Sequence, residues 1–390
     1  MRFLFLAKSK ADYRCYAAHA RALVNLLLDM GHEVDVYDYS TGVNYNQKTL
    51  TKVDYNLSLE FRLLNHISRY FAFIRFFKLN RNAYDILQVM YLRPEYFLLA
   101  NKVRLLAKKK LICIYGSDVN TYSFLKKLYQ KVIREADYVS FTTTDTLNSF
   151  VKKYRYNKRE NLVVNSFPVV KLGKINSDSV KHRKSFRVKY GIDSHETVVV
   201  CGMNSFPNEQ INIIADKISV KTYNRVVFVF PLTYGAKPPM LKKIIQHIQK
   251  VVTSNRVIII SSYLTDDEVL DLRFSTDILV NIRKKDQAGG AFIESLAAQS
   301  YVITGSWLPY GFLMEQGIYF KTVNTPSEIN DAIAEGINLR EKHEVKEKLM
   351  NNTRILNSNY SLEITMNRWR TFYGSIISSL TINSGENGNR

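Results

Sequence analysis

Residues 2–39 read RFLFLAKSKADYRCYAAHARALVNLLLDMGHEVDVYDY, and this stretch sets the pattern for the rest of the chain. Arg2–Ala7 is apolar and predicts a buried strand. An Ala- and Leu-rich stretch from about Asp12 to Met30 predicts a helix, and Glu33–Tyr39 alternates as a strand does. Strand, helix and strand in so short a space form a βαβ unit, which predicts a parallel sheet with right-handed crossovers.

The same alternation continues along the chain in two series. The first adds, in order, strand Asp85–Met90, helix Glu95–Ala107, strand Leu111–Tyr115, helix Thr121–Arg134, strand Tyr138–Thr143 and strand Asn161–Phe167. A polar, basic connector from Lys171 to Lys184 follows. The second series has predicted strands, each followed by a segment that suits a helix, at Val198–Gly202, Val226–Phe230, Val257–Ser261, Ile278–Ile282 and Tyr301–Thr304.

A chain of 390 residues exceeds the usual size of one hydrophobic core, so two domains are expected. The predicted fold class is α/β, with two tandem Rossmann-like doubly wound domains that face a central cleft. We assign residues 1–170 to the N-terminal domain and 171–360 to the C-terminal domain. Residues 361–390 are expected to form a helix that packs back toward the N-terminal domain and ends in a polar tail.

The composition restricts the class of partner. The formal net charge is +20, and between Ser58 and Lys110 eleven Lys or Arg stand against three acids, which attracts anions of any kind. Cys15, Cys113 and Cys201 have neither metal-site nor disulfide-framework spacing, so we expect free buried thiols in a reducing cytosol. No apolar run approaches the roughly 18 residues of a membrane span. We therefore expect a cytoplasmic protein.

The segment Ile282–Ala298 is the most informative for function. A strand ends, Arg283, Lys284, Lys285 and Asp286 follow, and Gly289 and Gly290 then lead into a helix with Glu294 in its expected first turn. Glycines allow a ligand to approach the backbone, and the start of a helix favours a phosphate. Glu294 could bind sugar hydroxyls, with Asp286 seven intervening residues before it. An ordinary strand–helix turn with a favourably placed Glu remains the alternative.

At this segment the sequence resembles the retaining GT-B glycosyltransferases, in particular the large bacterial group called family 4. That family carries an acid-x7-acid motif followed by an Ala-rich helix, a strand and a small-residue turn, and Asp286-x7-Glu294 matches it. The resemblance extends along most of the chain and includes segments similar to a subgroup that makes surface polysaccharides such as capsule or lipopolysaccharide. The other matching segments are Gly31–Val34, Tyr115–Val119, Phe230–Gly235 and Gly305–Tyr310.

The resemblance implies transfer of a hexose from a nucleotide-diphosphate sugar to a polysaccharide or lipid-linked acceptor, with retention of configuration. It places the donor in the C-terminal domain and the acceptor on the side of the N-terminal domain. The implied positions are Glu294 on the ribose, Asp286 near the transferred sugar, Gly289 and Gly290 beside the diphosphate, Tyr263 and Leu264 at the base, Asp118 as a second catalytic candidate, and Gly116 and Ser117 on the acceptor side.

The sequence departs from the family in three places. The family places an Arg and a Lys after the first C-domain strand, whereas here no cation occurs between Gly202 and Lys217. Arg283, Lys284, Lys285 or Lys237 could substitute, or each could be a solvated surface cation. The family's Gly-rich loop after the first strand is replaced by Ala7–Lys10, where Lys8 or Lys10 could supply charge. The first acid of the motif is Asp rather than Glu.

Catalytic groups and cofactors are less defined. No Asp-x-Asp triplet occurs, so we expect no essential metal and no cofactor beyond the nucleotide-sugar substrate. No carboxylate nucleophile is evident, and His19 and His66 are either bases or structural residues.

Residues 61–81 interleave cations with aromatic side chains. The segment could lie on an anionic membrane surface at the inner face of the cell membrane, or it could bury its aromatics and expose its cations. Two other functions also remain open. One is a basic protein that binds nucleic acid or a membrane surface without transferase activity, although no DNA- or RNA-reading motif occurs. The other is a nucleotide-sugar epimerase of the same architecture.

Overall fold

The structure is a computed structural model that describes residues 1–7, 14–38, 43–46, 52–54, 65–92, 106–116, 130, 132–156, 159–175 and 179–386. At 14–18, 43, 45, 52–54, 65–69 and 382–386 it describes the backbone alone. The chain forms two compact units, one of Met1–Pro168 with Glu363–Arg390 and the other of Val169–Leu362. The first division therefore falls at Pro168, two residues before the boundary predicted from the sequence.

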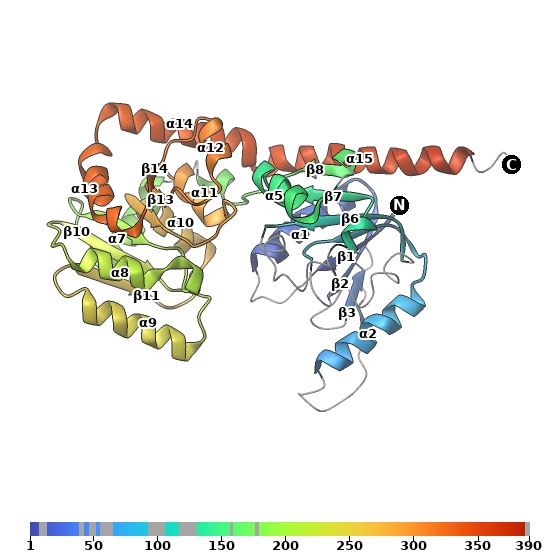
Figure 1. Cartoon of the computed structure of the whole chain (residues 1–390), viewed down its shortest axis with the longest axis horizontal. Coiled ribbons are helices and arrows are strands. Elements are labelled where there is room, and N and C mark those ends of the chain that lie inside the picture. Colours follow the sequence, from blue (N-terminus) through green and yellow to red (C-terminus); the bar gives the residue numbers. More distant parts are fainter. Residues whose placement is uncertain are drawn as a thin grey trace. The chain divides into compact units, whose positions relative to one another are not determined.

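The first unit contains an eight-stranded sheet with the order β4-β3-β2-β1-β5-β6-β7-β8 (Figure 1). Its strands are β1 (Arg2–Ala7), β2 (Glu33–Asp38), β3 (Val43–Asn46), β4 (Lys52–Asp54), β5 (Tyr84–Val89), β6 (Ala107–Ile114), β7 (Tyr138–Phe141) and β8 (Leu162–Val164), with helices α1 (Arg14–Asp29), α2 (Asn65–Leu79) and α5 (Thr144–Tyr154). All pairings are parallel except those of β3 with β2 and β4. These two antiparallel edge strands were not predicted.

The second unit contains a six-stranded parallel sheet with the order β11-β10-β9-β12-β13-β14. Its strands are β9 (Thr197–Cys201), β10 (Val226–Pro231), β11 (Arg256–Ile260), β12 (Ile278–Asn281), β13 (Tyr301–Gly305) and β14 (Lys321–Val323). Its helices are α6 (Leu172–Ile175), α7 (Ser179–Tyr190), α8 (Ile211–Ser219), α9 (Pro238–Val251), α10 (Asp266–Ser275), α11 (Gly290–Ala297), α12 (Gly311–Glu315), α13 (Ile329–Leu339) and α14 (His343–Tyr360). Two Rossmann-like doubly wound domains confirm the predicted fold class. The predicted connector 171–184 is partly helical, because α6 and the start of α7 lie within it.

Burial on both faces explains the continuous apolar strands. In β9, Val198 and Val200 pack into the core on one face of the sheet, and Val199 and Cys201 pack into the core on the other. All five residues of this strand are buried. A parallel sheet covered by helices on both faces requires this pattern, which is why the apolar runs predicted these strands well.

The start of β6 was predicted too late because its first residues include lysines. The sequence predicts a helix up to Ala107 and a strand only from Leu111, but β6 begins at Ala107 and includes three consecutive lysines. Lys108 pairs with Asp85 (2.8 Å) and Lys109 with Asp137 (3.3 Å), while Lys110 donates to a backbone carbonyl. Partners distant in the sequence therefore make a lysine run compatible with a strand.

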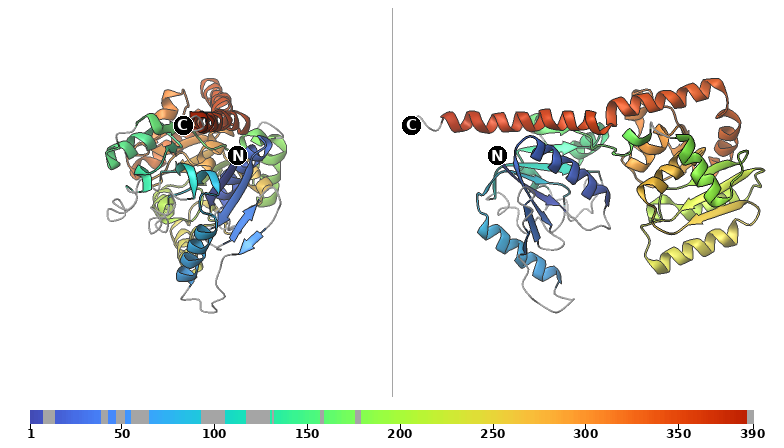
Figure 2. Two further views of the ribbon diagram at one scale, coloured as in Figure 1. Left: turned by 90° about the vertical axis from the view of Figure 1, so that its right-hand side faces the viewer. Right: turned by 180° about the vertical axis from the view of Figure 1, so that it is seen from behind.

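The C-terminal helix α15 (Leu362–Glu386) packs onto the first unit (Figure 2). Trp369, Tyr373 and Ile376 are fully buried and share one face of this helix. The indole of Trp369 donates to the carbonyl of Ser166 (3.1 Å), and the hydroxyl of Tyr373 donates to the side-chain oxygen of Gln88 (2.7 Å). The helix is thus an integral part of that unit's core. No helix in the described part of the chain is long and apolar enough to cross a membrane.

The packing of α15 predicts a large effect of one substitution. Trp369→Ala should lower the free energy of unfolding by about 3–5 kcal/mol, because it leaves a cavity between α15 and the sheet. Arg370→Ala, at the neighbouring exposed position, should change it by less than about 0.5 kcal/mol. Urea unfolding followed by circular dichroism measures both, and equal effects would show that α15 does not belong to this core.

Candidate functional site

The order of strands in the second sheet identifies one position for a site. After β9, the chain adds β10 and then β11 toward one edge of the sheet. It then returns and adds β12 on the other side of β9. In β9 and β12, Val199 lies opposite Ile278 and Cys201 opposite Val280. Both strands are parallel, so the loops after them leave the same edge side by side. Doubly wound sheets bind their ligands at such a switch point, beyond the carboxyl ends of the strands.

The two loops at the switch point are joined by hydrogen bonds. The backbone N–H of Lys284 donates to the carbonyl of Asn208 (3.0 Å). The Asn208 side chain accepts from the N–H of Lys285 (3.0 Å) and donates to its carbonyl (2.6 Å). The side-chain amide of Gln210 donates to the carbonyl of Ile282. The loop that carries the acid-x7-acid motif is therefore fixed to the loop after β9.

A buried ion cluster lies beneath this junction. Arg283 donates through Nε (2.7 Å) and Nη2 to Oε1 of Glu209, and through Nη1 to Oδ1 of Asp286 (2.7 Å). Glu209 is completely buried, and its other oxygen accepts from the N–H of Met203 (3.0 Å). Burial raises the pKa of Glu209, and Arg283 opposes this rise. Burial alone would lower the pKa of Arg283, but the two carboxylates raise it above its ordinary value.

The second oxygen of Asp286 is also bound. Oδ2 accepts from the hydroxyl of Tyr310 and, over 3.4 Å, from the backbone N–H of Gly289. Burial, and then the charge of Asp286, raise the pKa of Tyr310 well above its ordinary value, so this phenol stays protonated and donates. The Tyr310 ring stacks on Phe292 of α11 with centroids 4.3 Å apart. Asp286 therefore holds the loop to α11 and to the α12 side of the sheet.

Glu294 is not placed where the sequence predicted. Helix α11 begins at Gly290, so Glu294 is its fifth residue and lies beyond the first turn. The helix already starts at the second glycine, because Ala288 takes a left-handed conformation (φ 52°) and Gly289 forms the N-cap. Glu294 is buried, and its Oε2 accepts from Nε of Arg273 (3.2 Å). A simple helix-dipole role, which is confined to the first turn, does not explain this buried acid.

The remaining predicted residues are divided between the units. Lys284 and Lys285 are exposed beside the ion cluster, Tyr263 is exposed after β11, and Leu264 is buried. Lys237 is exposed at the N-cap of α9. In the first unit Gly116 follows β6 with φ 104°, whereas Ser117, Asp118, Lys8, Lys10 and the side chain of His66 lie outside the described residues.

His19 lies at the carboxyl end of the first unit's sheet. Its ring lies parallel to the rings of Phe167 (centroids 5.1 Å apart) and Tyr115 (6.2 Å), which stack on each other at 4.5 Å. Burial lowers the pKa of His19 to about 4, so the imidazole is neutral near pH 7. Its environment is an aromatic stack, which is typical of a structural histidine.

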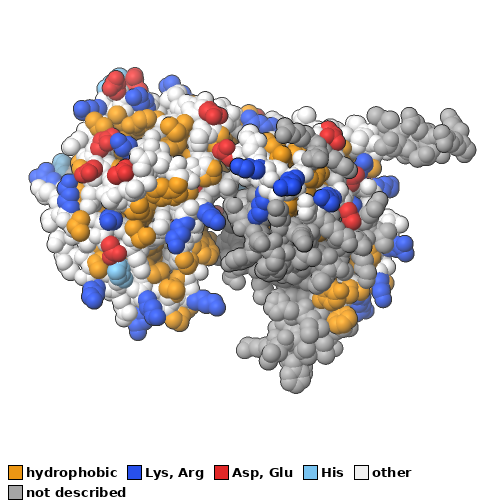
Figure 3. Space-filling view, viewed as in Figure 1, with side chains coloured by type: hydrophobic (Ala, Val, Ile, Leu, Met, Phe, Trp, Pro, Cys, Tyr) orange, Lys and Arg blue, Asp and Glu red, His pale blue; other side chains and the backbone are white. Residues whose placement is uncertain are grey.

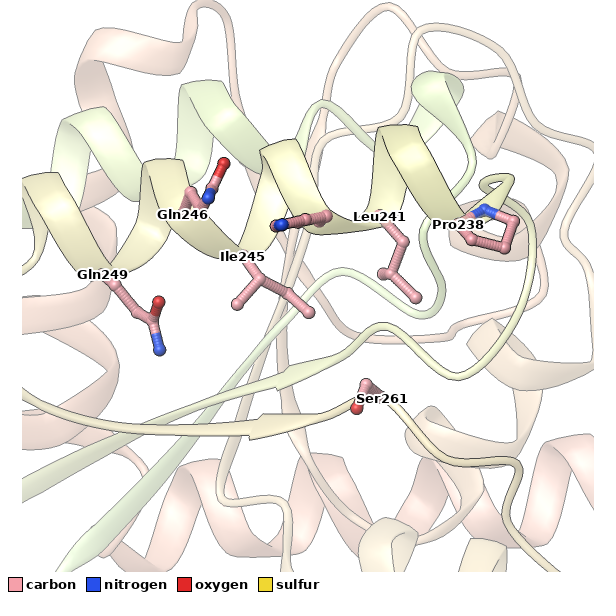
Figure 4. A pocket seen from close by; sticks show the side chains of 7 residues that line it. Pro238, Leu241, Ile245, Gln246, Gln249 and Ser261 are labelled. Carbon is pink, nitrogen blue, oxygen red and sulfur yellow. The ribbon is translucent and has the colours of Figure 1, made fainter.

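A separate hollow of about 460 Å³ lies along α9 in the second unit (Figure 4). Pro238, Leu241 and Ile245 of the helix line it together with Ser261 after β11. It is shallow and contains no group of ionisable side chains. Within the described part of the chain, no three His, Cys, Asp or Glu side chains are grouped so as to hold a metal ion.

Sequence reasoning missed four residues of this site: Glu209, Arg273, Trp307 and Tyr310. The loop Gly202–Gln210 was noted only because it lacks the family's cations, yet its one acid binds Arg283. An acid in a loop expected to be basic, with an Arg in the motif loop, was the available signal. The Trp307 indole donates to the carbonyl of Arg283 (2.7 Å), a contact that no spacing indicates.

No family model matches the chain, and no curated protein matches it in sequence. Solved structures do match in fold over nearly their full length. They include a glycosyltransferase from Rickettsia africae ESF-5 (TM-score 0.71, 14% identity, 96% of this chain and 98% of that chain). The Anabaena protein Alr3699/HepE in complex with UDP and glucose matches with TM-score 0.70 and 12% identity, over 96% and 100% of the two chains. WaaG, a glycosyltransferase involved in lipopolysaccharide biosynthesis, matches with TM-score 0.61 and 12% identity, over 94% and 98%.

These likenesses show that the chain has the GT-B fold of two Rossmann-like domains. At such low identity they establish the fold and leave its activity to be argued from the site.

The ion cluster predicts a specific stability change. Arg283→Met should lower the free energy of unfolding by about 3–5 kcal/mol, because Glu209 and Asp286 then lack their buried cation. Lys284→Met, at the exposed neighbour, should change it by less than about 0.5 kcal/mol. Urea titrations of both variants measure the difference.

The same variant should depend on pH in a defined direction. Arg283 opposes the rise in the pKa of Glu209, so its loss raises that pKa further. Between the unfolded-state pKa of this glutamate and its raised folded-state pKa, the folded protein holds a proton that the unfolded chain has lost, so stability falls as pH rises through this window and then levels off. The loss of unfolding free energy in Arg283→Met, relative to the wild type, should be largest near pH 8 and smaller near pH 5. A deficit that does not vary with pH would indicate lost packing rather than unpaired carboxylates.

Proposed function

We propose that the protein is a glycosyltransferase that takes a hexose from a nucleotide-diphosphate sugar. The observation that carries this proposal is the buried Glu294, held by Arg273 beside Gly289 and Gly290 at the switch point of the second sheet. A buried acid is costly unless it is paired or binds a ligand. Oε2 of Glu294 is used by Arg273, and Oε1 lies on the side of Gly290, 3.8 Å from where a side chain there would begin.

In this proposal Glu294 accepts hydrogen bonds from the ribose hydroxyls, as acids do in dinucleotide-binding folds. Because Gly290 has no side chain, the nucleotide can approach Oε1 of Glu294 over its backbone. Arg273 orients Glu294 through its hydrogen bond to Oε2. Solved structures of HepE with UDP and with UDP-glucose are consistent with a nucleotide-sugar donor for this fold.

The diphosphate is assigned to Lys284 and Lys285 rather than to Arg283. Arg283 is enclosed by two carboxylates, so one positive charge faces two negative ones and the cluster offers no net attraction to an anion. The two lysines are exposed next to it, and the start of α11 adds backbone donors. These groups stabilise the charge that develops on the leaving nucleoside diphosphate.

Asp286 acts in this proposal as a positioning residue. Both of its oxygens are already bound, by Arg283 on one side and by Tyr310 with Gly289 on the other. It therefore holds Gly289 at the N-cap of α11, where the transferred sugar and diphosphate bind. We assign no carboxylate nucleophile, propose retention of configuration without an essential metal, and leave Asp118 as the candidate on the acceptor side.

The donor site predicts selective stabilisation by one nucleotide. In a thermal-shift screen of UDP, GDP, TDP, ADP and CMP, one nucleoside diphosphate at about 100 times its Kd should raise Tm by about 5 °C. Glu294→Gln keeps an acceptor for Arg273 but loses the charge, and should weaken that nucleotide about ten-fold.

Glu335→Gln is the matched control, since Glu335 of α13 pairs with Lys321 and lies away from the motif loop. If Glu294→Gln and Glu335→Gln bind the nucleotide equally well, Glu294 does not hold the ribose. If no nucleotide shifts the folded wild-type protein, the transferase proposal fails.

The acceptor is proposed to be a polysaccharide or lipid-linked oligosaccharide reached at the inner face of the cell membrane. In α2, Phe73 and Phe76 are buried, while Arg75 and Lys78 are exposed. Phe71 and Leu79 remain 48% and 67% exposed on the outer side. Residues 70–82 contain no acid. Cations with interspersed exposed apolar side chains suit the interface of an anionic membrane.

Vesicle binding tests this surface. Arg75→Glu with Lys78→Glu should abolish most co-sedimentation with vesicles of phosphatidylglycerol and phosphatidylcholine, at about 1 kcal/mol per cation removed. Lys242→Glu with Lys243→Glu on α9 changes the net charge equally and should bind nearly as well as the wild type. Equal losses in both double variants would show that binding follows net charge and not α2.

The nucleic-acid alternative gains no support from the one face of the second unit that Figure 3 shows. On the face of the second unit shown in Figure 3, Lys and Arg are scattered among acids and apolar side chains and form no continuous stripe. The epimerase alternative is separated by product analysis, because an epimerase isomerises the nucleotide sugar and releases no nucleoside diphosphate.

A further inference from the structure

Exposed aromatic side chains gather at the carboxyl edge of the second sheet. Each of four different strands there is followed by a loop with one large aromatic that is at least 39% exposed. They are Phe206 after β9, Tyr234 after β10, Tyr263 after β11 and Trp307 after β13. In the strand order these loops occupy successive positions on both sides of the motif loop after β12. Ligands of such sheets bind at this same edge.

Trp307 is the most firmly held of the four. Its indole Nε1 donates to the carbonyl of Arg283 (2.7 Å), which ties the ring to the motif loop. The ring lies against Gly305, where any Cβ would come within 2.3 Å of it. The glycine thus allows the ring to lie flat on the strand end. The indole is fixed in place although 39% of the residue is exposed to solvent.

Phe206 lies on the opposite side of the motif loop and is seated in a similar way. Its ring packs on Gly235, where a Cβ would approach the ring within 2.9 Å and the φ of 119° already favours glycine. Two residues later, Asn208 bonds to the backbone of Lys284 and Lys285. Fixed, exposed aromatic rings therefore stand on both flanks of two exposed lysines.

This arrangement suits one type of ligand. A ring that is already fixed loses little conformational entropy when a ligand binds. Covering the apolar face of an exposed indole also removes apolar surface from water, which favours binding. Trp presents a large flat apolar face, and here its N–H is already satisfied by protein. The flat C–H face of a pyranose complements such a surface, and a charged or phosphorylated part of the same ligand would meet the lysines.

We propose that the exposed indole face of Trp307 is the stacking surface for a pyranose ring at this site. The inference rests on the proposed transferase function and specifies which residue selects the sugar. The Arg283 carbonyl that holds the indole belongs to the same loop as Asp286, whose side chain accepts from the N–H of Gly289 at the N-cap of α11. The pyranose is either the hexose of the donor or a sugar of the acceptor, and the experiment separates the two.

The protein's own fluorescence reports on this surface. The chain has two tryptophans, and Trp369 is completely buried in the first unit whereas Trp307 is exposed. A ligand that covers Trp307 should shift its emission to shorter wavelength and protect it from acrylamide quenching. UDP, UDP-glucose, UDP-galactose, UDP-N-acetylglucosamine and maltoheptaose are titrated separately, and maltoheptaose is also added to the UDP complex.

Each result has one meaning for the proposal. A change with a UDP-sugar but not with UDP assigns Trp307 to the donor hexose, and a change only with maltoheptaose assigns it to an acceptor sugar. An equal change with UDP alone would overturn the proposal, since the base or phosphate then covers the indole. If calorimetry shows that UDP and the UDP-sugars bind but no titration changes the fluorescence, the stacking role of Trp307 is overturned and the transferase proposal stands. If UDP does not bind but another nucleotide of the thermal-shift screen does, that nucleotide and its sugars replace UDP and the UDP-sugars; if none binds, the transferase proposal fails and the maltoheptaose titration alone decides.

Two substitutions separate stacking from support of the loop. Trp307→Phe keeps an aromatic face but loses the bond to Arg283, and Trp307→Leu loses both. Stacking predicts that Trp307→Leu weakens the pyranose-containing ligand roughly three- to ten-fold relative to Trp307→Phe, with UDP affinity equal in the two variants. Equal losses in both variants would show that Trp307 only supports the loop. Val188→Ala, at an exposed apolar position of α7, which leads into the opposite edge of the same sheet, should have no effect.

Discussion

The parallel pairing of β9 with β12 is the constraint on which the candidate site depends. These strands are neighbours in the sheet although β10, β11 and three helices separate them along the chain. Their pairing places Glu209 next to Arg283, 74 residues later in the sequence. Without this reversal of strand order, the loop after β9 and the motif loop after β12 would not meet. The ion cluster, the hydrogen bonds of Asn208 and the position of Asp286 all follow from it.

The ion cluster then holds the loop after β9 and the motif loop rigidly together. Removing Glu209, Arg283 and Asp286 from water costs free energy. This cost is offset because nearly every polar atom of the three side chains has a hydrogen-bond partner. Such a network allows few alternative arrangements, so Gly289 and the start of α11 are fixed before any ligand arrives. The Trp307 indole depends on the same loop, because its hydrogen bond goes to the carbonyl of Arg283. Arg283 thus joins the loop after β9, the side chain of Asp286 and the indole of Trp307.

The sequence predicted the regular part of the fold well. Val226–Phe230 was predicted as a strand and β10 spans Val226–Pro231, because a strand buried on both faces must be apolar throughout. β6 was predicted to start too late, since its lysines are neutralised by Asp85 and Asp137 from other elements. The edge strands β3 and β4 are short and polar, and nothing in their local pattern indicated a strand.

The position of the motif loop in the fold followed from the sequence, but the contacts of its side chains did not. The acid-x7-acid spacing identified the loop that contains Asp286 and Glu294, and the structure places both at the switch point. The partners of Arg283 depend on strand order, which one sequence does not specify. Glu294 was assigned to the first turn of its helix, and the left-handed Ala288 moves the start of that helix to Gly290. A left-handed alanine is uncommon and has no signature in the sequence.

The central claim is that a nucleotide sugar binds across the loops after β9 and β12. Hydrogen exchange followed by mass spectrometry, with and without saturating nucleoside diphosphate, tests it most directly because it locates binding along the chain. The account predicts slower exchange in peptides that cover residues 203–210 and 283–298, with the opposite end of the sheet near Asp277 unchanged. Protection confined to other segments, or no protection anywhere in the folded protein, would contradict it.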